Sequence, residues 1–256
     1  MDNMVRLLEL FDSSFEYKWE APILHSEVGL TSHIATFEVP IDSSEAIVGD
    51  LPKEVIKDLI KDGFNINRKI WDQRGLNPLD TPITDIMIEV EFATIHGSGN
   101  RVAYDPNREV YIIEFLAHLF AQKKYNPLSK DDVGEDDPVL IGTTYNATGL
   151  GNAPVIFSTI KNVVEDFIER QGDKVSGLLF SGKGSGRQKV YRVFAKALSR
   201  QLGFSIIDLR KASALDFDDD WMRRTFWIAE DLMKLQGRNN EWYFLVDPSV
   251  ARSSNG

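Results

Sequence analysis

The sequence contains no cysteine among its 256 residues. A disulfide scaffold, a thiolate metal site, an iron–sulfur cluster and a cysteine nucleophile are therefore all excluded. No run of apolar residues approaches the roughly 18 that a membrane-spanning helix needs, and residues 1–4 are acidic rather than basic, unlike the start of a secretory signal. These absences predict a cytoplasmic protein that has no membrane partner.

An excess of positive charge is also missing, because 29 Lys and Arg face 39 Asp and Glu and the net charge is −10. A net negative charge argues against a protein that coats DNA through its overall charge, although a local basic face is compatible with it. Residues 183–200 hold six Lys or Arg and no acid. The segment from Lys183 to Arg200 is therefore a candidate face for nucleic acid.

The apolar pattern predicts an α/β (α+β) fold, with a mixed, partly antiparallel central sheet flanked by helices. The clearest alternation, over 85–95, predicts a strand that pairs antiparallel with the next one. Expected strands cover 32–40, 85–95, 110–115, 139–145, 175–180, 204–209 and 242–246, and expected helices cover 51–64, 152–170, 187–202 and 218–235. For domains we expect an N-terminal portion at 1–80, a core at 81–250 and a tail at 251–256, or else one elaborated domain.

Glycines mark the first of two strand-to-helix junctions, at 145–153. Gly149 and Gly151 let the backbone approach a ligand closely, and free N–H groups at a helix start hold phosphate well. A tight turn without any ligand fits the same residues.

The second junction, at 181–189, combines glycines with basic residues. Lys183, Arg187 and Lys189 form a candidate anion site beside the flexible backbone of Gly184, and a solvated basic helix start is the equal alternative. A P-loop is excluded, because Gly184 stands where that motif places its magnesium-binding Ser or Thr.

The stretch 145–209, a quarter of the chain, resembles the acetyl-CoA-binding half of the GNAT acetyltransferase superfamily. More narrowly, it resembles a group of uncharacterised bacteriophage proteins with that topology. The matching residues are Thr148, Gly149, Gly151, Ala153, Ile156, Phe157, Thr159, Phe180, Ser181, Lys183, Gly184, Arg187, Lys189, Val190, Tyr191, Leu202, Gly203 and Phe204.

The resemblance implies a GNAT-like core and acetyl-CoA as a possible cofactor. The cofactor-binding residues it implies are Asn146, Gly149, Leu150, Gly151, Asn152, Lys183, Gly184 and Arg187. Two positions depart from the superfamily pattern: Asn146 stands where Gln or Arg is usual, and Ser199 stands where the general-acid Tyr is often found. A serine hydroxyl is a much poorer proton donor than a phenol, so Ser199 is a weak catalytic candidate.

An acyl transfer would also need a base for the acceptor amine. Glu89 and Glu91 share one face of the expected strand 85–95 and are the main candidates, with His96 and Glu114 beside them. A solvent-facing polar side of a half-buried sheet explains the same alternation. The remaining histidines, His25, His33 and His118, have no partner at ligand spacing, so no metal site is predicted.

Acidic residues cluster at 131–137 and at 216–220. The first cluster does not fit a calcium-binding loop, and the second precedes an expected helix for which Asp218 is a candidate N-cap. Both clusters are interpreted as solvated, and the alternative is a surface for a basic partner.

Two functions stay open. One is a non-catalytic or degenerate bacteriophage protein of GNAT-like fold that binds a host factor, another phage protein or nucleic acid, in the host cytoplasm or in the virion. The alternative is an acetyl-CoA-dependent N-acyltransferase. The sequence does not choose an oligomeric state.

Overall fold

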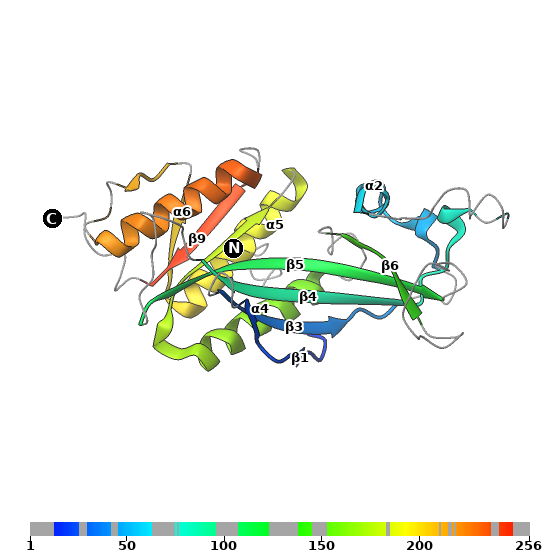
Figure 1. Ribbon diagram of the computed structural model, residues 1–256, viewed down its shortest axis with the longest axis horizontal. Coiled ribbons are helices and arrows are strands. Elements are labelled where there is room, and N and C mark those ends of the chain that lie inside the picture. The colour runs from blue at the N-terminus through cyan, green and yellow to red at the C-terminus, as the bar shows by residue number, and fades with distance from the viewer. Residues whose placement is uncertain are drawn as a thin grey trace, which may run out of the picture. The chain divides into compact units, whose positions relative to one another are not determined.

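The computed structural model describes residues 13–25, 30–41, 46–62, 75, 77–95, 107–122, 138–144, 153–182, 185–209, 211–214, 217, 219–236 and 241–247. Within these residues the chain forms a mixed α/β fold built on a nine-stranded sheet, which confirms the predicted class (Figure 1). The strands are β1 (Lys18–Trp19), β2 (Ile23–His25), β3 (Leu30–Glu38), β4 (Asp85–Thr94), β5 (Glu109–Gln122), β6 (Pro138–Thr144), β7 (Val175–Gly182), β8 (Ser205–Asp208) and β9 (Glu241–Val246). The helices are α2 (Lys53–Asp62), α4 (Ala153–Gln171), α5 (Ser185–Leu202) and α6 (Asp220–Gln236), with short 3-10 turns η1 (Val48–Asp50), η2 (Pro78–Asp80) and η6 (Gly172–Lys174).

The sheet follows the order β1-β3-β4-β5-β7-β9-β8, with β2 paired to β3 and β6 paired to β5. The backbone N–H of Ile95 donates to the carbonyl of Val110, and that of Thr84 donates to the carbonyl of Phe120. These contacts make β4 and β5 antiparallel, as the sequence predicts. The pairing of β5 with β7 is parallel and makes the sheet mixed.

One edge of β5 is divided between two partners. Residues Glu109 to Ile112 pair with β7, whereas Ala117 to Gln122 pair with β6. A register shift between Leu119 and Phe120 interrupts the second pairing.

The chain separates into two compact units, each drawn from three stretches of sequence. The first unit contains Met1–Glu20, Ala35–Val90 and Phe115–Ile160, and the second contains Ala21–Ile34, Glu91–Glu114 and Lys161–Gly256. Strands β3, β4 and β5 and helix α4 contribute residues to both.

In the first unit, α2 packs on β6 through its apolar side. Val55 and Leu59 are fully buried, and Leu59 lies so close to Gly142 that an added Cβ there would come within 2.8 Å of its Cδ2 atom. Asp58 accepts a hydrogen bond of 2.9 Å from the hydroxyl of Thr144. Gly142 therefore sets how closely the helix approaches the strand.

In the second unit, helices cover both faces of strands β7 and β9 (Figure 1). Phe180 of β7 packs edge-on against Phe194 of α5, with ring centroids 5.7 Å apart. Its neighbour Leu179 belongs instead to a buried cluster with Phe226 of α6 and Phe244 of β9. Because successive strand residues point to opposite faces, α5 and α6 lie on opposite sides of this part of the sheet.

Several boundaries differ from the sequence prediction; for example, β3 spans Leu30–Glu38 rather than 32–40. Strand β5 continues to Gln122, well beyond the expected end at Phe115, and α6 begins at Asp220 rather than at Asp218. Helix α5 begins at Ser185, so Ser185 and Gly186 are helical although the sequence places them in a loop. A glycine costs only about 1 kcal/mol inside a helix, which the apolar spacing further along α5 overrides.

Among the described helices, none is long and apolar enough to cross a membrane.

Candidate functional site

The predicted cofactor residues fall largely outside the described part of the chain. Seven of them are outside the described residues: Asn146, Gly149, Leu150, Gly151, Asn152, Lys183 and Gly184. Arg187 lies in the first turns of α5, where the structure describes the backbone but not the side chain. His96 and the acidic cluster at 131–137 also lie outside the described residues.

Ser199, the weak candidate for a general acid, closes the end of its own helix. Its hydroxyl donates a hydrogen bond of 2.6 Å to the backbone carbonyl of Phe204. Between them Gly203 adopts a positive φ of 69°, the left-handed conformation that commonly ends a helix. The Ser199 proton is therefore held in a structural contact.

Glu89, the first candidate base, pairs with a histidine that the sequence leaves without a partner. Its Oε2 atom lies 3.1 Å from Nε2 of His118 on the neighbouring strand β5. Both side chains are mostly buried, at 23% and 15% exposure, so solvent still reaches the pair. A carboxylate that contacts one ring nitrogen fixes the orientation of the imidazole, and the hydrogen bond at that nitrogen influences which of the two nitrogens carries the proton.

Glu91 and Glu114 are half-buried in the second unit, on β4 and β5 respectively. The burial along β4 alternates, with Glu89 and Glu91 among the less buried positions, as the predicted strand requires. The structure pairs only Glu89 with a histidine in the described contacts.

A line of exposed cations runs along α5. Arg192, Lys196 and Arg200 are all exposed and stand four residues apart, which places them on one side of the helix; we call them the basic ridge. Helix α5 contains no Asp or Glu, so none of these charges has a counter-charge on its own helix. Because the segment 183–200 carries six positive charges, the rest of the chain has a net charge of −16.

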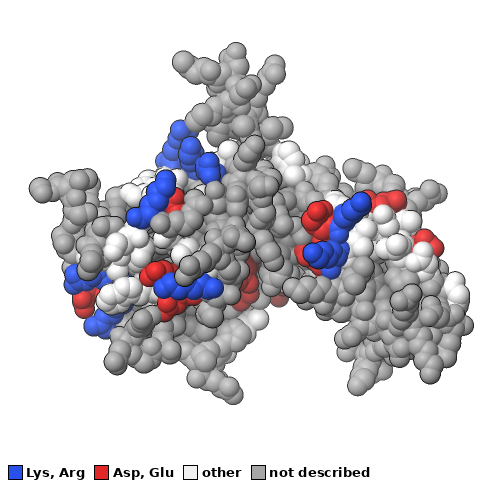
Figure 2. Space-filling view, turned by 90° about the horizontal axis from the view of Figure 1, so that it is seen from above, with Lys and Arg blue, Asp and Glu red and all other residues white. Residues whose placement is uncertain are grey.

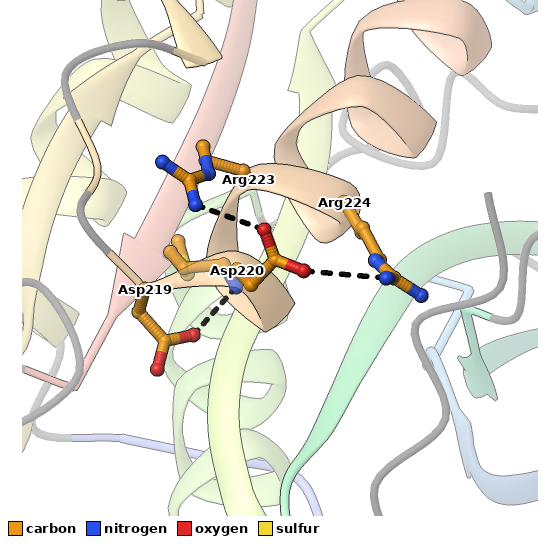
Figure 3. A network of polar contacts seen from close by, with 5 residues as sticks. Asp219, Asp220, Arg223 and Arg224 are labelled. Carbon is orange, nitrogen blue, oxygen red and sulfur yellow. Dashed lines mark hydrogen bonds and ion pairs between the residues drawn. The ribbon is translucent and has the colours of Figure 1, made fainter.

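The cations of α6 stand in a different setting, shown in Figure 3. Asp220 lies between two guanidinium groups, 2.8 Å from Arg223 and 3.2 Å from Arg224. The hydrogen bond from Arg223 is the main reason why the pKa of Asp220 lies below its usual value. Further along, Lys234 lies 3.1 Å from Glu230. These cations are neutralised within their own helix.

The N-cap of α6 is Asp219, one residue after the predicted Asp218, which lies outside the described residues. One carboxylate oxygen of Asp219 accepts a hydrogen bond of 2.8 Å from the backbone N–H of Met222, the N-cap to N3 contact. The other oxygen lies 3.0 Å from Arg108, whose guanidinium also stands 5.7 Å from the ring centre of Trp221. The acidic cluster at 216–220 therefore contributes at least two carboxylates to the start of α6.

On the face drawn in Figure 2, most of the described Lys and Arg side chains lie against Asp or Glu side chains. This mixing is typical of a solvated surface.

A half-buried histidine lies in an aromatic cluster of the second unit. The ring of His33 meets Phe167 and Tyr111 edge-on, at centroid distances of 5.4 and 6.2 Å. Burial lowers the pKa of His33, and the nearby Glu109 opposes that shift. Burial also raises the pKa of Tyr111, helped by the hydrogen bond that its hydroxyl donates to Glu109.

Comparison of the chain with protein-family models, with curated proteins and with solved structures finds no match. The described residues contain no group of three or more His, Asp or Glu side chains placed to hold a metal ion.

Proposed function

We propose that the protein is a non-catalytic member of the GNAT-like bacteriophage group that it resembles, and that it acts by binding nucleic acid through the basic ridge. The observation that carries this proposal is the ridge itself: three exposed cations on one side of a helix that has no acid. A polyanion gains most from such a surface, because each neutralised phosphate releases condensed counterions.

The state of Ser199 supports the absence of catalysis. A general acid must give its proton to a leaving group, whereas this hydroxyl donates to Phe204 in the helix end. The basic ridge needs no such chemistry, since it acts by charge alone.

The test is a binding titration of labelled DNA followed by fluorescence anisotropy. A charge-driven, non-specific complex has a Kd of roughly 10⁻⁴ to 10⁻⁶ M at physiological salt. Replacing the ridge in the variant R192Q/K196Q/R200Q removes three phosphate contacts, which weakens binding on the order of a hundredfold at about 0.15 M salt.

The matched control is the variant R223Q/R224Q/K234Q, which removes three charges from α6. Its total charge change is identical, but its cations lie on α6 and are not part of the basic ridge. We expect this variant to keep most of the affinity. Equal losses in the two variants, or no binding by the unmodified protein, would overturn the proposal.

The pair of Glu89 and His118 favours a second candidate, an acetyl-CoA-dependent N-acyltransferase. A histidine oriented by a carboxylate is a suitable base for an acceptor amine. Calorimetry with acetyl-CoA tests this candidate, and no heat of binding at millimolar ligand would remove it. If acetyl-CoA binds, replacing Gly149 and Gly151 with bulkier residues should abolish that binding.

A further inference from the structure

We infer that four polar side chains, which cross one face of the sheet in the first unit, bind a neutral carbohydrate. The four are Lys18 of β1, Thr36 of β3, Glu89 of β4 and His118 of β5, and we call them the polar row. This inference does not rest on the proposed function, because the cations of the basic ridge belong to the second unit.

Two contacts between β3 and β4 determine which of their residues face each other. The backbone N–H of Val39 donates to the carbonyl of Ile86, and that of Thr31 donates to the hydroxyl of Thr94. Counting back from the first contact along two antiparallel strands arrives at the second contact. The register is therefore the same at both contacts.

This register places Thr36 directly opposite Glu89, and residues that lie directly opposite each other direct their side chains to the same face. On its other side, Thr36 is paired with Lys18 of β1. His118 joins from β5, since its Nε2 atom lies 3.1 Å from Oε2 of Glu89. The polar row thus crosses β1, β3, β4 and β5, and at about 4.8 Å between strands it is about 14 Å long.

Thr36 supplies a hydrogen-bonding group that the described part of the protein does not use. Its side chain is 2% exposed, and its Oγ1 atom has no hydrogen-bond partner among the described residues. Buried hydroxyls are normally paired, because an unpaired one has given up its hydrogen bonds to water. Glu89 and His118 beside it are 23% and 15% exposed, so a molecule from solvent reaches this part of the row.

The hydrogen-bonding chemistry of the polar row selects the class of ligand. Lys18 only donates and an ionised Glu89 only accepts, whereas the hydroxyl of Thr36 does both, as does a neutral imidazole at His118. A simple ammonium ion carries donors alone and cannot pair with Lys18. A carboxylate carries acceptors alone and cannot pair with Glu89.

A carbohydrate carries hydroxyl groups along its whole length, and each of them can donate and accept. It therefore satisfies both ends of the polar row and also Thr36 between them. A zwitterion long enough to pair its two charges with Lys18 and Glu89 would instead place its methylene groups against Thr36.

Apolar side chains adjoin the polar row on β5 and β6. Leu116 and Phe120 flank His118 at alternate positions of β5, and both are half-buried as it is. On β6, Leu140 lies opposite Phe120 and is 45% exposed. An apolar surface with a few placed polar groups is typical of sites for small molecules, and the C–H groups of a sugar ring can pack on it.

The experiment uses the full chain and saturation-transfer NMR, which detects weak binding from the signals of the ligand. The carbohydrate probes are glucose, maltose, lactose and sucrose, and the other probes are methylammonium, acetate and glycine. T36V removes the hydroxyl and keeps the shape of the side chain, and E89Q removes the charge. The matched control is T225V, because Thr225 of α6 is also 2% exposed and its hydroxyl also has no partner among the described residues. Urea unfolding establishes that all variants are folded.

We expect at least one of the carbohydrates to bind and none of the other three probes to displace it. T36V should weaken this binding roughly 2–10-fold and E89Q about tenfold or more, whereas T225V should leave it unchanged. No signal from any carbohydrate, equal affinities of T36V and T225V, or displacement of the carbohydrate by glycine or methylammonium would overturn the inference. The ridge variant R192Q/K196Q/R200Q should bind the carbohydrate as the unmodified protein does, so failure of the DNA titration leaves this inference intact.

Discussion

Replacing Asp219 with alanine tests how the start of α6 is held. The substitution removes the hydrogen bond to the backbone N–H of Met222 and the ion pair with Arg108. Loss of an N-cap costs about 1 kcal/mol. The ion pair is more than one-third exposed at both side chains, so solvent screening limits its contribution to between 0 and about 1 kcal/mol. We expect D219A to lower the free energy of unfolding by about 1–2 kcal/mol.

Two further variants separate the contributions. Asparagine caps a helix as well as aspartate, so D219N keeps the cap and loses only the ion pair with Arg108. D220A is the matched control, because Asp220 is the adjacent aspartate and pairs only with Arg223 and Arg224 on the exposed side of the helix. We expect D219A to be more destabilising than either D219N or D220A.

Urea unfolding followed by tryptophan fluorescence measures the three variants, and Trp221 lies at the site itself. If D219N lost as much stability as D219A, the N-cap hydrogen bond would not contribute to the stability of the protein. The assignment of the N-cap to Asp219 would be refuted if D220A lost as much as D219A.

Three more predictions concern the second unit and the packing of α2. Burial lowers the pKa of His33 below 6.5, so near this pH the unfolded chain binds a proton more readily than the folded chain does. The free energy of unfolding should therefore fall as the pH drops below about 6.5. H33F should flatten the dependence of the urea midpoint on pH in this range. Parallel curves for H33F and the unmodified protein would show that His33 is not the group responsible. S199A should cost about 1 kcal/mol for the lost hydrogen bond, with no effect on DNA affinity measured by anisotropy. An added Cβ at Gly177 would lie 2.8 Å from the ring of Phe244 and 3.1 Å from a backbone oxygen, so G177A should lower the free energy of unfolding by about 1–3 kcal/mol. G142A should cost less, because its Cβ meets only the flexible end of a leucine side chain. Equal melting temperatures of the two variants would contradict this prediction.

The fold class could be predicted because most elements carry a clear apolar period. The alternation of Ile86, Ile88, Val90 and Phe92 predicts β4 to within a residue of its observed end. The end of β5 could not be predicted in the same way, because residues beyond Phe115 include Ala117, Leu119 and Ala121, which favour helices as readily as strands. Only their burial against the rest of the sheet makes them a strand.

The candidate sites show the same limit. The basic ridge follows from helical spacing alone, so the sequence indicates it. The partner of Glu89 does not, because His118 comes from another strand and the contact depends on how the two strands align. No sequence signal placed His118 on that strand, because the expected strand ends at Phe115 and His118 lies beyond it. The position of the N-cap was ambiguous for a different reason: several aspartates in succession can each cap, and only the geometry selects Asp219.

The divided edge of β5 has a consequence for the order in which the chain folds. Ala117 pairs with Thr144, a short way along the chain, whereas Glu109 pairs with Val175, beyond the whole of α4. Closing the shorter loop costs less entropy, so the hairpin of β5 and β6 forms readily while the parallel pairing with β7 waits for the helix and the turn that follow it. We therefore expect the two ends of this strand to become paired at different steps of folding, the end that faces β6 before the end that faces β7.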